Sequence, residues 1–408
     1  MGMKLHRNRR TMFQRRNRVL TIVLSILSAL AVISIGFFSA KFLNERPQTQ
    51  PDAGQTPTAS APAESQTTLP VQTQPESTDS AIKGIYLPLS SLQEETTRLG
   101  LLEQAAAAGF NSVIFDLKGE DGTLYYRFTS NQAVQVNRYA GNALSAEDLA
   151  GLFAAIRQAG LQPIPRLYAF RDHAAAKMLT GARITITGNS GWVWYDNDPA
   201  NGGRAWLNPY ADEAQQYILA LSRELQQAGA AAILLDGVEF PAQTQSANFG
   251  NSSNTSMSRN EILTAFVQKV RTALSNCPII LSSTCQGALG INTTIYGNNP
   301  LTFAPHIAAP FILPGKLDAT IRVGETTIAN TQDNPEKTVQ ALVEQMVLRT
   351  KVMQADTRPT LCPWLQAEGY SPQQIRQEIT GCKAGGVSSF ILYHSKGQYD
   401  FHSLKGAF

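Results

Sequence analysis

The sequence predicts an α/β fold, and three observations lead from there to a (β/α)8 barrel, the TIM barrel. First, short apolar runs alternate with amphipathic stretches rich in Ala, Leu and Gln over residues 82–394. Second, there are eight such runs, the number of strands in a closed parallel barrel. Third, the run AAAILLDGVEFP at 230–241 is apolar until Asp236, which is typical of a strand buried on both faces. An open doubly wound sheet is the runner-up, but no GxGxxG or GK(S/T) loop follows any run, so no nucleotide site is predicted.

Each predicted strand is a short run rich in aliphatic and aromatic residues. In chain order the strands cover 82–87, 111–118, 162–170, 231–236, 278–284, 305–313, 358–366 and 386–394. Predicted helices lie between most of them, at 95–108, 146–159, 212–228, 259–274, 335–353 and 372–382. Gly109, Gly160 and Gly229 follow the first three helices, where glycine commonly ends a helix. No helix is evident between the fifth and sixth strands, which is the weakest point of the barrel prediction.

The first eighty residues predict a membrane anchor and a linker. Residues 1–18 carry seven Lys and Arg and no acid, and residues 19–40 carry no charge. About 22 uncharged residues can cross a bilayer core of about 30 Å, and the basic flank should stay in the cytoplasm. We therefore expect a single-pass signal anchor in the cell membrane with its C-terminal side extracytoplasmic. A cleavable signal peptide, whose apolar region is usually shorter, is the alternative. Residues 41–80, dominated by Pro, Gln, Thr and Ser, should be a disordered linker, and residues 81–408 the barrel domain.

The charge of the exported part argues against nucleic-acid binding. The chain has 34 Lys and Arg against 31 Asp and Glu, a formal net charge of +3. Without the seven cations of the tail, 27 basic residues remain against 31 acidic ones, a net charge of −4. Nucleic-acid-binding domains are basic, so no nucleic-acid partner is predicted.

The four cysteines form neither a disulfide framework nor a metal-binding motif. Cys277 and Cys285 bracket one predicted strand, which keeps them more than about 20 Å apart at about 3.3 Å per residue, so they cannot pair. A bridge between Cys362 and Cys382 and four buried free thiols both remain open. There is no CxxC or Cys/His zinc spacing, and the five histidines are scattered. No metal or cofactor is predicted.

The carboxyl ends of barrel strands meet at one mouth, where barrel enzymes carry out their chemistry. Asp236, which ends the fourth strand, is the main catalytic candidate, as a nucleophile or a transition-state stabiliser, and the alternative is an Asp that caps the next turn. Candidates for a second catalytic carboxyl group are Glu239, Asp172 and Glu368. The residues expected to bind substrate at strand ends and in the long loops are Asp116, Lys118, Arg166, Tyr168, Trp206, Trp364, Gln366, Tyr393 and His394.

Further expectations concern the orientation of Asp116, Lys118, Arg166 and His306. Asp116 and Lys118 lie two apart in one strand, so they should share a face. Asp116 is expected to pair with Lys118 or Arg166, and both cations are expected to face inward and hold carboxylates. His306 starts the sixth strand at the opposite end of the barrel, so it is expected to be structural.

This mixture of residues suits a carbohydrate ligand. Aromatic rings cover the apolar faces of sugar rings, while carboxylates and amides bind the hydroxyl groups. Glycoside hydrolysis needs a pair of carboxyl groups, one as acid and one as base or nucleophile. The sequence contains no GxSxG or HExxH motif for other hydrolytic chemistries.

Five motifs, FDLKGEDGTLYY, RLYAFRD, WLNPYADEAQQYILALSREL, ILLDGVEFP and CPWLQ, resemble a family of glycoside hydrolase domains, classed as a domain of unknown function and allied to the α-amylase-like (β/α)8 barrels. The resemblance covers residues 82–399 and implies a barrel that acts on polysaccharide. The positions that match the family's motif residues are Asp116, Lys118, Arg166, Asp172, Asn208, Pro209, Asp236, Trp364 and Gln366. It thereby adds Asn208 to the expected substrate-binding residues.

The chain also departs from the family pattern. The family's DYVRFP reads DGVEFP here, so an aromatic residue becomes Gly237 and a cation becomes Glu239. No carboxylate follows the fifth strand, where α-amylase-like enzymes carry their acid. Two functions remain open: a membrane-tethered glycoside hydrolase acting on an envelope or extracellular polysaccharide, and a catalytically inactive barrel that binds glycan or scaffolds envelope machinery.

Overall fold

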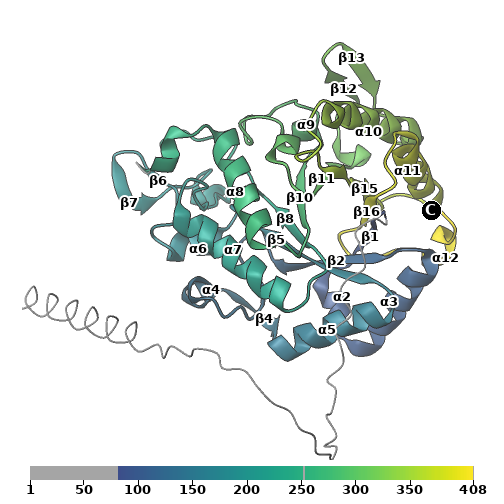
Figure 1. The fold of residues 1–408 in the computed structure, drawn as a ribbon, viewed down its shortest axis with the longest axis horizontal. Coiled ribbons are helices and arrows are strands. Elements are labelled where there is room, and N and C mark those ends of the chain that lie inside the picture. Colours follow the sequence, from purple (N-terminus) through teal and green to yellow (C-terminus); the bar gives the residue numbers. More distant parts are fainter. Residues whose placement is uncertain (1–80, 251–252, 408) are drawn as a thin grey trace, which may run out of the picture. The chain divides into compact units, whose positions relative to one another are not determined.

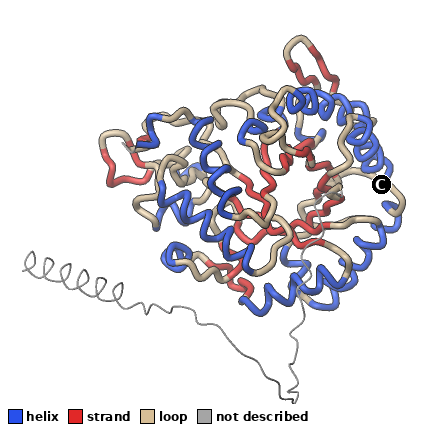
Figure 2. The backbone as a smooth tube through the Cα atoms, viewed as in Figure 1, coloured by secondary structure: helices blue, strands red, loops and turns tan. Residues whose placement is uncertain are grey.

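The computed structural model of the protein describes residues 81–250 and 253–407. Its centre is a barrel of parallel strands surrounded by helices (Figures 1 and 2). The barrel closes because β1 pairs with both β2 and β16. Its strands are β1 (Lys83–Tyr86), β2 (Ser112–Lys118), β5 (Gln162–Tyr168), β8 (Ile233–Asp236), β10 (Ile279–Thr284), β11 (Ile307–Ile312), β14 (Thr360–Leu361), β15 (Trp364–Gln366) and β16 (Phe390–Tyr393). Since β14 and β15 both pair with β11, they share the seventh position, and the predicted eight-stranded barrel is confirmed.

All six predicted helices are present on the outside of the barrel. The α-helices are α2 (Leu89–Gln93), α3 (Glu95–Ala108), α4 (Asn131–Val136), α5 (Ala146–Gln158), α6 (His173–Met178), α7 (Asp212–Gln227), α8 (Arg259–Ala273), α9 (Cys285–Ala288), α10 (Pro335–Lys351), α11 (Pro372–Ala384) and α12 (Phe401–Leu404). Short 3₁₀ turns lie at η1 (Pro199–Asn201), η2 (Ser253–Ser256), η3 (Pro300–Phe303) and η4 (Pro314–Lys316).

Local sequence signals fix where the long helices start and stop. Ser145, Ser258 and Ser371 each form a capping box at the start of α5, α8 and α11, where side chain and backbone satisfy each other's hydrogen bonds. Gly109 and Gly160 follow α3 and α5 with φ of 104° and 78°, the left-handed conformation that glycine adopts without strain. These signals explain why the helix prediction agrees with the structure.

The connection from β10 to β11 has no long helix, as the sequence indicated, and contains only α9 and η3. It nevertheless brings Tyr296 against the barrel. The Tyr296 hydroxyl accepts a hydrogen bond from the backbone N–H of Thr284 at 3.0 Å. A Cβ at Gly287 would lie 2.4 Å from the Tyr296 ring, so only glycine fits at this position.

Smaller strands extend the loops around the barrel. They are β3 (Leu124–Tyr126), β4 (Tyr139–Leu144), β6 (Thr185–Ile186), β7 (Asn189–Val193), β9 (Ala247–Asn248), β12 (Thr320–Val323) and β13 (Thr326–Ala329). The β12–β13 hairpin projects from the barrel in Figure 1. The β6, β7 and β9 strands form a separate small sheet.

The barrel interior is filled with apolar side chains below its mouth. Ile114, Ile164, Leu234, Ile280 and Ile391 come from five different strands, are at most 2% exposed and pack into one cluster. A second, larger cluster lies between the barrel wall and the helices. The interior is therefore a packed core and not a pore.

The cysteines and His306 have structural positions. All four cysteines are free and buried, so of the two alternatives left open the structure has four thiols. His306 accepts a hydrogen bond from the backbone N–H of Ile279 at 3.1 Å, at the end of the barrel away from the mouth, as expected.

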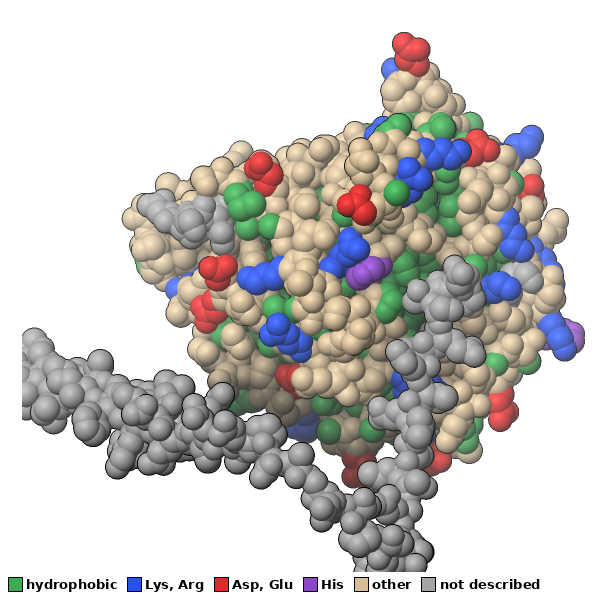
Figure 3. Space-filling model, in the orientation of Figure 1, with side chains coloured by type: hydrophobic (Ala, Val, Ile, Leu, Met, Phe, Trp, Pro, Cys, Tyr) green, Lys and Arg blue, Asp and Glu red, His purple; other side chains and the backbone are tan. Residues whose placement is uncertain are grey.

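The predicted tail, membrane span at 19–40 and linker lie outside the described residues. None of the helices in residues 81–250 and 253–407 combines the length and apolar character that a bilayer span needs. On the face shown in Figure 3, basic and acidic side chains are interspersed.

Candidate active site

Polar side chains replace the apolar filling at the carboxyl end of the barrel. The register places Asp116 of β2 opposite Arg166 of β5, and Tyr168 of β5 opposite Asp236 of β8. Three neighbouring strands thus deliver two carboxylates and a guanidinium to one place. This is the end of the barrel at which the sequence predicted a site.

Arg166 is the hub of this group. Its guanidinium binds Asp116 through two hydrogen bonds of 2.5 and 3.0 Å and reaches Asp236 at 3.5 Å. It also lies 5.0 to 5.4 Å from the ring centres of Tyr86, Tyr168 and Trp364. Since a buried cation needs a partner, the bidentate pair with Asp116 is what keeps Arg166 stable here. The predicted inward orientation of Arg166 and its pairing with Asp116 are confirmed.

Asp236 is 8% exposed at the end of β8. Burial raises the pKa of its carboxyl group, and the negative charge of Asp116 acts in the same direction. Arg166 and the backbone N–H of Gly237, which donates to Asp236 Oδ1 at 2.8 Å, oppose this rise. Asp236 therefore has a cation and a fixed donor that stabilise its ionised form.

The backbone conformation at position 237 favours glycine. Its φ is +62°, a value that costs a residue with a side chain about 1–2 kcal/mol. A Cβ here would meet only ordinary contacts, the nearest at 3.5 Å from Tyr168. The left-handed turn, and not lack of space, thus favours glycine where the family has an aromatic residue.

Glu239 lies in the same turn and is half-buried. Burial raises the pKa of Glu239 to about 7, and the negative charge of Asp236 contributes to the rise. Arg171 and a hydrogen bond with the Tyr296 hydroxyl act in the opposite direction. The site therefore contains one carboxyl group that exchanges its proton near neutral pH, beside another that contacts Arg166.

The other two candidates for the second catalytic carboxyl group lie elsewhere. Asp172 is 0% exposed, pairs with Lys118 at 2.8 Å and caps α6 by accepting from the backbone N–H of Ala175. Glu368 lies at the rim after β15 and accepts from the Ser395 hydroxyl at 2.8 Å, which lowers its pKa. Glu239, in contrast, lies close enough to Asp236 for the charge of Asp236 to act on it.

The orientation of Lys118 differs from the expectation that it shares a face of the strand with Asp116. The pairing of β2 with β5 shifts between Asp116 and Lys118, so Lys118 aligns with Leu167. This bulge turns Lys118 away from the barrel interior and into the layer beneath α7, where its ammonium lies 5.8 Å from the Tyr217 ring. Asp116 and Lys118 therefore do not share a face. Lys118 does hold a carboxylate, but one that is buried outside the mouth.

Several predicted substrate-binding residues have internal partners. Trp364 is fully buried and donates to Ser282 Oγ at 2.9 Å, so it forms the floor of the site. Asn208 is buried and bonds the backbone of Tyr210 and Phe249. Trp206 donates to Asp196 at 2.8 Å and lies under the guanidinium of Arg171 at 5.7 Å. These residues shape the site more than they face a ligand.

The remaining predicted residues lie at the rim on the β15 and β16 side. Tyr393 is half-buried, with its ring 5.2 Å from that of Tyr86. Gln366 accepts from the backbone N–H of Gly315 at 2.8 Å, and His394 accepts from that of Lys396 at 3.1 Å. Tyr393 is thus the aromatic side chain of this group best placed to meet a sugar ring.

Sequence reasoning missed two residues of the site. Tyr86 ends β1 and donates its hydroxyl proton to Asp116 Oδ2 at 2.8 Å. Its position at a strand end was a usable signal. Tyr296, which contacts Glu239, comes from the irregular β10–β11 connection, where no periodic pattern marks any residue.

The described part of the chain offers no metal site, since no group of three or more His, Cys, Asp or Glu side chains gathers there with suitable geometry. The fold and site define a (β/α)8 barrel with a carboxyl pair at its mouth. A family model described as "Putative glycosyl hydrolase domain" matches residues 84–399. The chain belongs to this family, which confirms the resemblance stated from the motifs.

Distant likenesses to solved structures accompany the family match. The glycoside hydrolase domain of PelA from Pseudomonas aeruginosa is 12% identical, with a TM-score of 0.41 over 79% of this chain and 98% of that one. The catalytic domain of β-amylase from Paenibacillus polymyxa is 9% identical, with a TM-score of 0.48 over 79% and 95%. A hypothetical protein from Ruminiclostridium thermocellum is 17% identical, with a TM-score of 0.42 over 48% and 96%. No curated protein matches the chain at a significant level.

Proposed function

We propose that the barrel hydrolyses glycosidic bonds and that Asp236 and Glu239 are its catalytic carboxyl pair. The observation that carries this proposal is the difference in environment between the two groups. Glu239 has a pKa of about 7 and can donate a proton near neutral pH, whereas Asp236 faces Arg166 and the Gly237 N–H. Burial raises the pKa of Asp236 as well, but Arg166 and the Gly237 N–H stabilise the ionised form of Asp236 directly. Two carboxyl groups in such unequal environments suit acid and base roles.

In this proposal Glu239 protonates the oxygen of the leaving sugar. Asp236 is the carboxylate that stabilises the positive charge developing on the other sugar, or attacks its anomeric carbon. Water then bonds to that carbon and gives a proton to the deprotonated Glu239, which restores both groups. Arg166 and Asp116 position Asp236 and do not exchange protons themselves. Tyr393 would cover one face of the sugar ring, with Tyr86 packed against Tyr393.

We further propose that the substrate is an envelope or extracellular polysaccharide and that residues 19–40 tether the domain to the cell membrane. The support for this is the uncharged stretch with its basic flank. A membrane-attached barrel would meet glycans on the outer side of that membrane.

The test is turnover by purified full-length protein on a panel of polysaccharides and aryl glycosides. Asp236→Asn keeps the shape of the side chain but removes its charge, so we expect turnover to fall by orders of magnitude with little change in unfolding. The matched control is Glu325→Gln, at an exposed turn of the β12–β13 hairpin, which should leave turnover unchanged.

If Asp236→Asn keeps the turnover of the unmodified protein on any substrate that the latter cleaves, the proposed pair is wrong. If the unmodified protein binds glycans but cleaves none, and Asp236→Asn changes only affinity, the barrel is a binding protein.

A further inference from the structure

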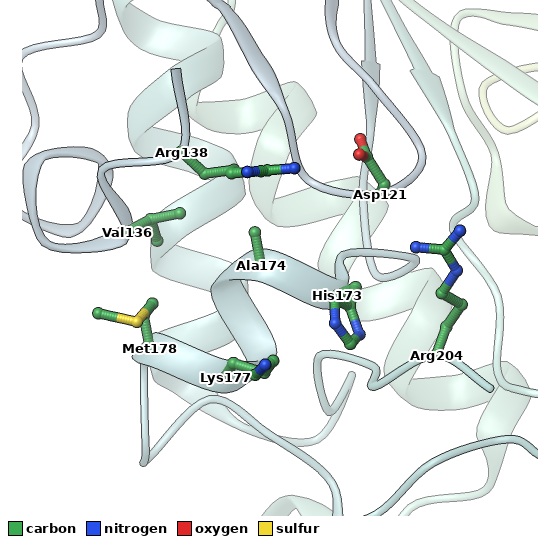
Figure 4. Close-up of a pocket in the computed structure, with 8 residues that line it drawn as sticks. All are labelled: Asp121, Val136, Arg138, His173, Ala174, Lys177, Met178 and Arg204. Carbon is green, nitrogen blue, oxygen red and sulfur yellow. The ribbon is translucent and has the colours of Figure 1, made fainter. Parts of the chain in front are cut away.

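A pocket with a volume of about 350 Å³ opens among the loops at the mouth end of the barrel. Its walls come from four segments: the β2–β3 loop, the end of α4 with the turn after it, helix α6, and the loop before α7 (Figure 4). All four lie at the mouth end of the barrel. The residues lining the pocket are Asp121, Val136, Arg138, His173, Ala174, Lys177, Met178 and Arg204.

Arg171 links the surroundings of the pocket to the active site. Asp121 follows Glu120, whose carboxylate pairs with Arg171 at 3.0 Å. Arg171 in turn lies over Trp206, two residues after Arg204. Arg171 also lowers the pKa of Glu239, so its side chain lies near Glu239 as well as near the neighbours of two pocket residues. A ligand extending from the site along this side would enter the pocket.

The pocket carries an excess of positive charge. Arg138, Lys177 and Arg204 are exposed, and none of them takes part in the five ion pairs formed within residues 81–250 and 253–407. The one acid of the lining, Asp121, is already bound to the backbone N–H and hydroxyl of Thr123 at 3.0 and 2.9 Å. In Figure 4 the three cations project from different segments around the same space. The lining therefore has three positive side chains and one negative side chain, which is hydrogen-bonded to Thr123.

His173 keeps its neutral form in these surroundings. Its Nδ1 accepts a hydrogen bond from the backbone N–H of Ala205 at 3.0 Å, and protonation of Nδ1 would break that bond. Burial lowers the pKa of His173, and Lys177 and Arg204 lower it further, while Asp172 and Asp121 act in the opposite direction. The positive charges of the pocket thus lower the pKa of a side chain inside it.

We propose that this pocket binds the oxyanion of an acidic sugar unit, a carboxylate or a phosphate, and so selects an anionic glycan. The proposal rests on the proposed function, because the sugar would belong to the hydrolysed substrate. Arginine side chains match the geometry of both oxyanions. Val136, Ala174 and Met178 supply an apolar wall for the sugar ring. Because the two anions share this chemistry, the experiment must separate them.

Isothermal calorimetry on the full-length protein tests this directly, with D-glucuronate, D-glucose 6-phosphate and D-glucose as probes at constant ionic strength. We expect one or both anionic sugars to bind at least tenfold more tightly than glucose, and the preferred one identifies the anion. Arg138→Gln/Arg204→Gln should weaken that binding at least tenfold. The control double variant Arg322→Gln/Lys351→Gln removes two exposed charges outside the pocket and should not.

Proton uptake provides a second readout. A bound anion raises the pKa of His173, so binding near pH 6 should take up protons, measurable from the buffer dependence of the binding heat. His173→Gln should abolish this uptake and retain binding. Equal affinity for glucose, or equal weakening in the control variant, overturns the proposal. Because calorimetry needs no turnover, such a failure is distinct from a failure of hydrolysis by Asp236 and Glu239.

Discussion

Glu239 gives the proposed reaction a pH dependence that can be measured. As a general acid it must be protonated, so turnover should fall as the pH rises through about 7. Glu239→Gln should remove this alkaline limb and slow the cleavage of poor leaving groups most, while glycosides of acidic phenols are spared because they need little protonation. A limb near pH 7 that persists in Glu239→Gln would assign the proton donor elsewhere.

The same group affects stability in a defined direction. The pKa of Glu239 is about 7 in the folded protein, above its usual 4.5, so its protonation favours folding. Its contribution is complete below pH 4.5 and is lost as the pH rises through 7. The difference in unfolding free energy between the unmodified protein and Glu239→Gln should therefore change over this interval.

Lys118 tests the buried ion pair outside the mouth. Lys118→Met leaves the fully buried carboxylate of Asp172 without its cation and should lower the unfolding free energy by about 3–5 kcal/mol. Denaturant titration measures this. Lys118→Met/Asp172→Asn should recover part of the loss, since Asn can still cap α6. The control Lys351→Met, at an exposed position, should change stability by less than about 0.5 kcal/mol.

At the scale of elements, helix α5 offers a matched pair of glycines. A Cβ added at Gly151 or at Gly160 would point into open space. Only Gly160 has a positive φ, of 78°. Gly151→Ala should stabilise the protein by about 0.5–1 kcal/mol, because alanine favours the helix interior. Gly160→Ala should destabilise it by about 1–2 kcal/mol. Thermal unfolding of both variants checks the opposite signs.

Element positions could be predicted from the sequence because several long helices carry start or stop signals and each barrel strand has an apolar run. The capping box at Ser371 and the glycine at 109 are examples. The orientation of Lys118 could not be predicted, because one bulge reverses the alternation of a strand and leaves no mark in its composition. Tyr296 could not be predicted either, because its contact with Glu239 depends on the path of an irregular loop.

For the whole molecule, the charge distribution of the first forty residues predicts orientation in the membrane. Protease added to intact cells should remove the C-terminal domain and leave the basic tail. A domain that survives in intact cells and is cut only after lysis would reverse the orientation. A cytoplasmic protein of known location serves as the control for cell integrity.

The apolar filling under Arg166 and Asp236 closes the barrel below its mouth, so the site is open at one end only. Nothing can thread through it, so a polymer can reach the carboxyl pair only by lying across the opening or by dipping one end into it. Both products must then leave on the side from which the substrate arrived. The loops around the opening, and the cationic pocket among them, would thus decide which stretch of a long polymer comes to rest over Glu239.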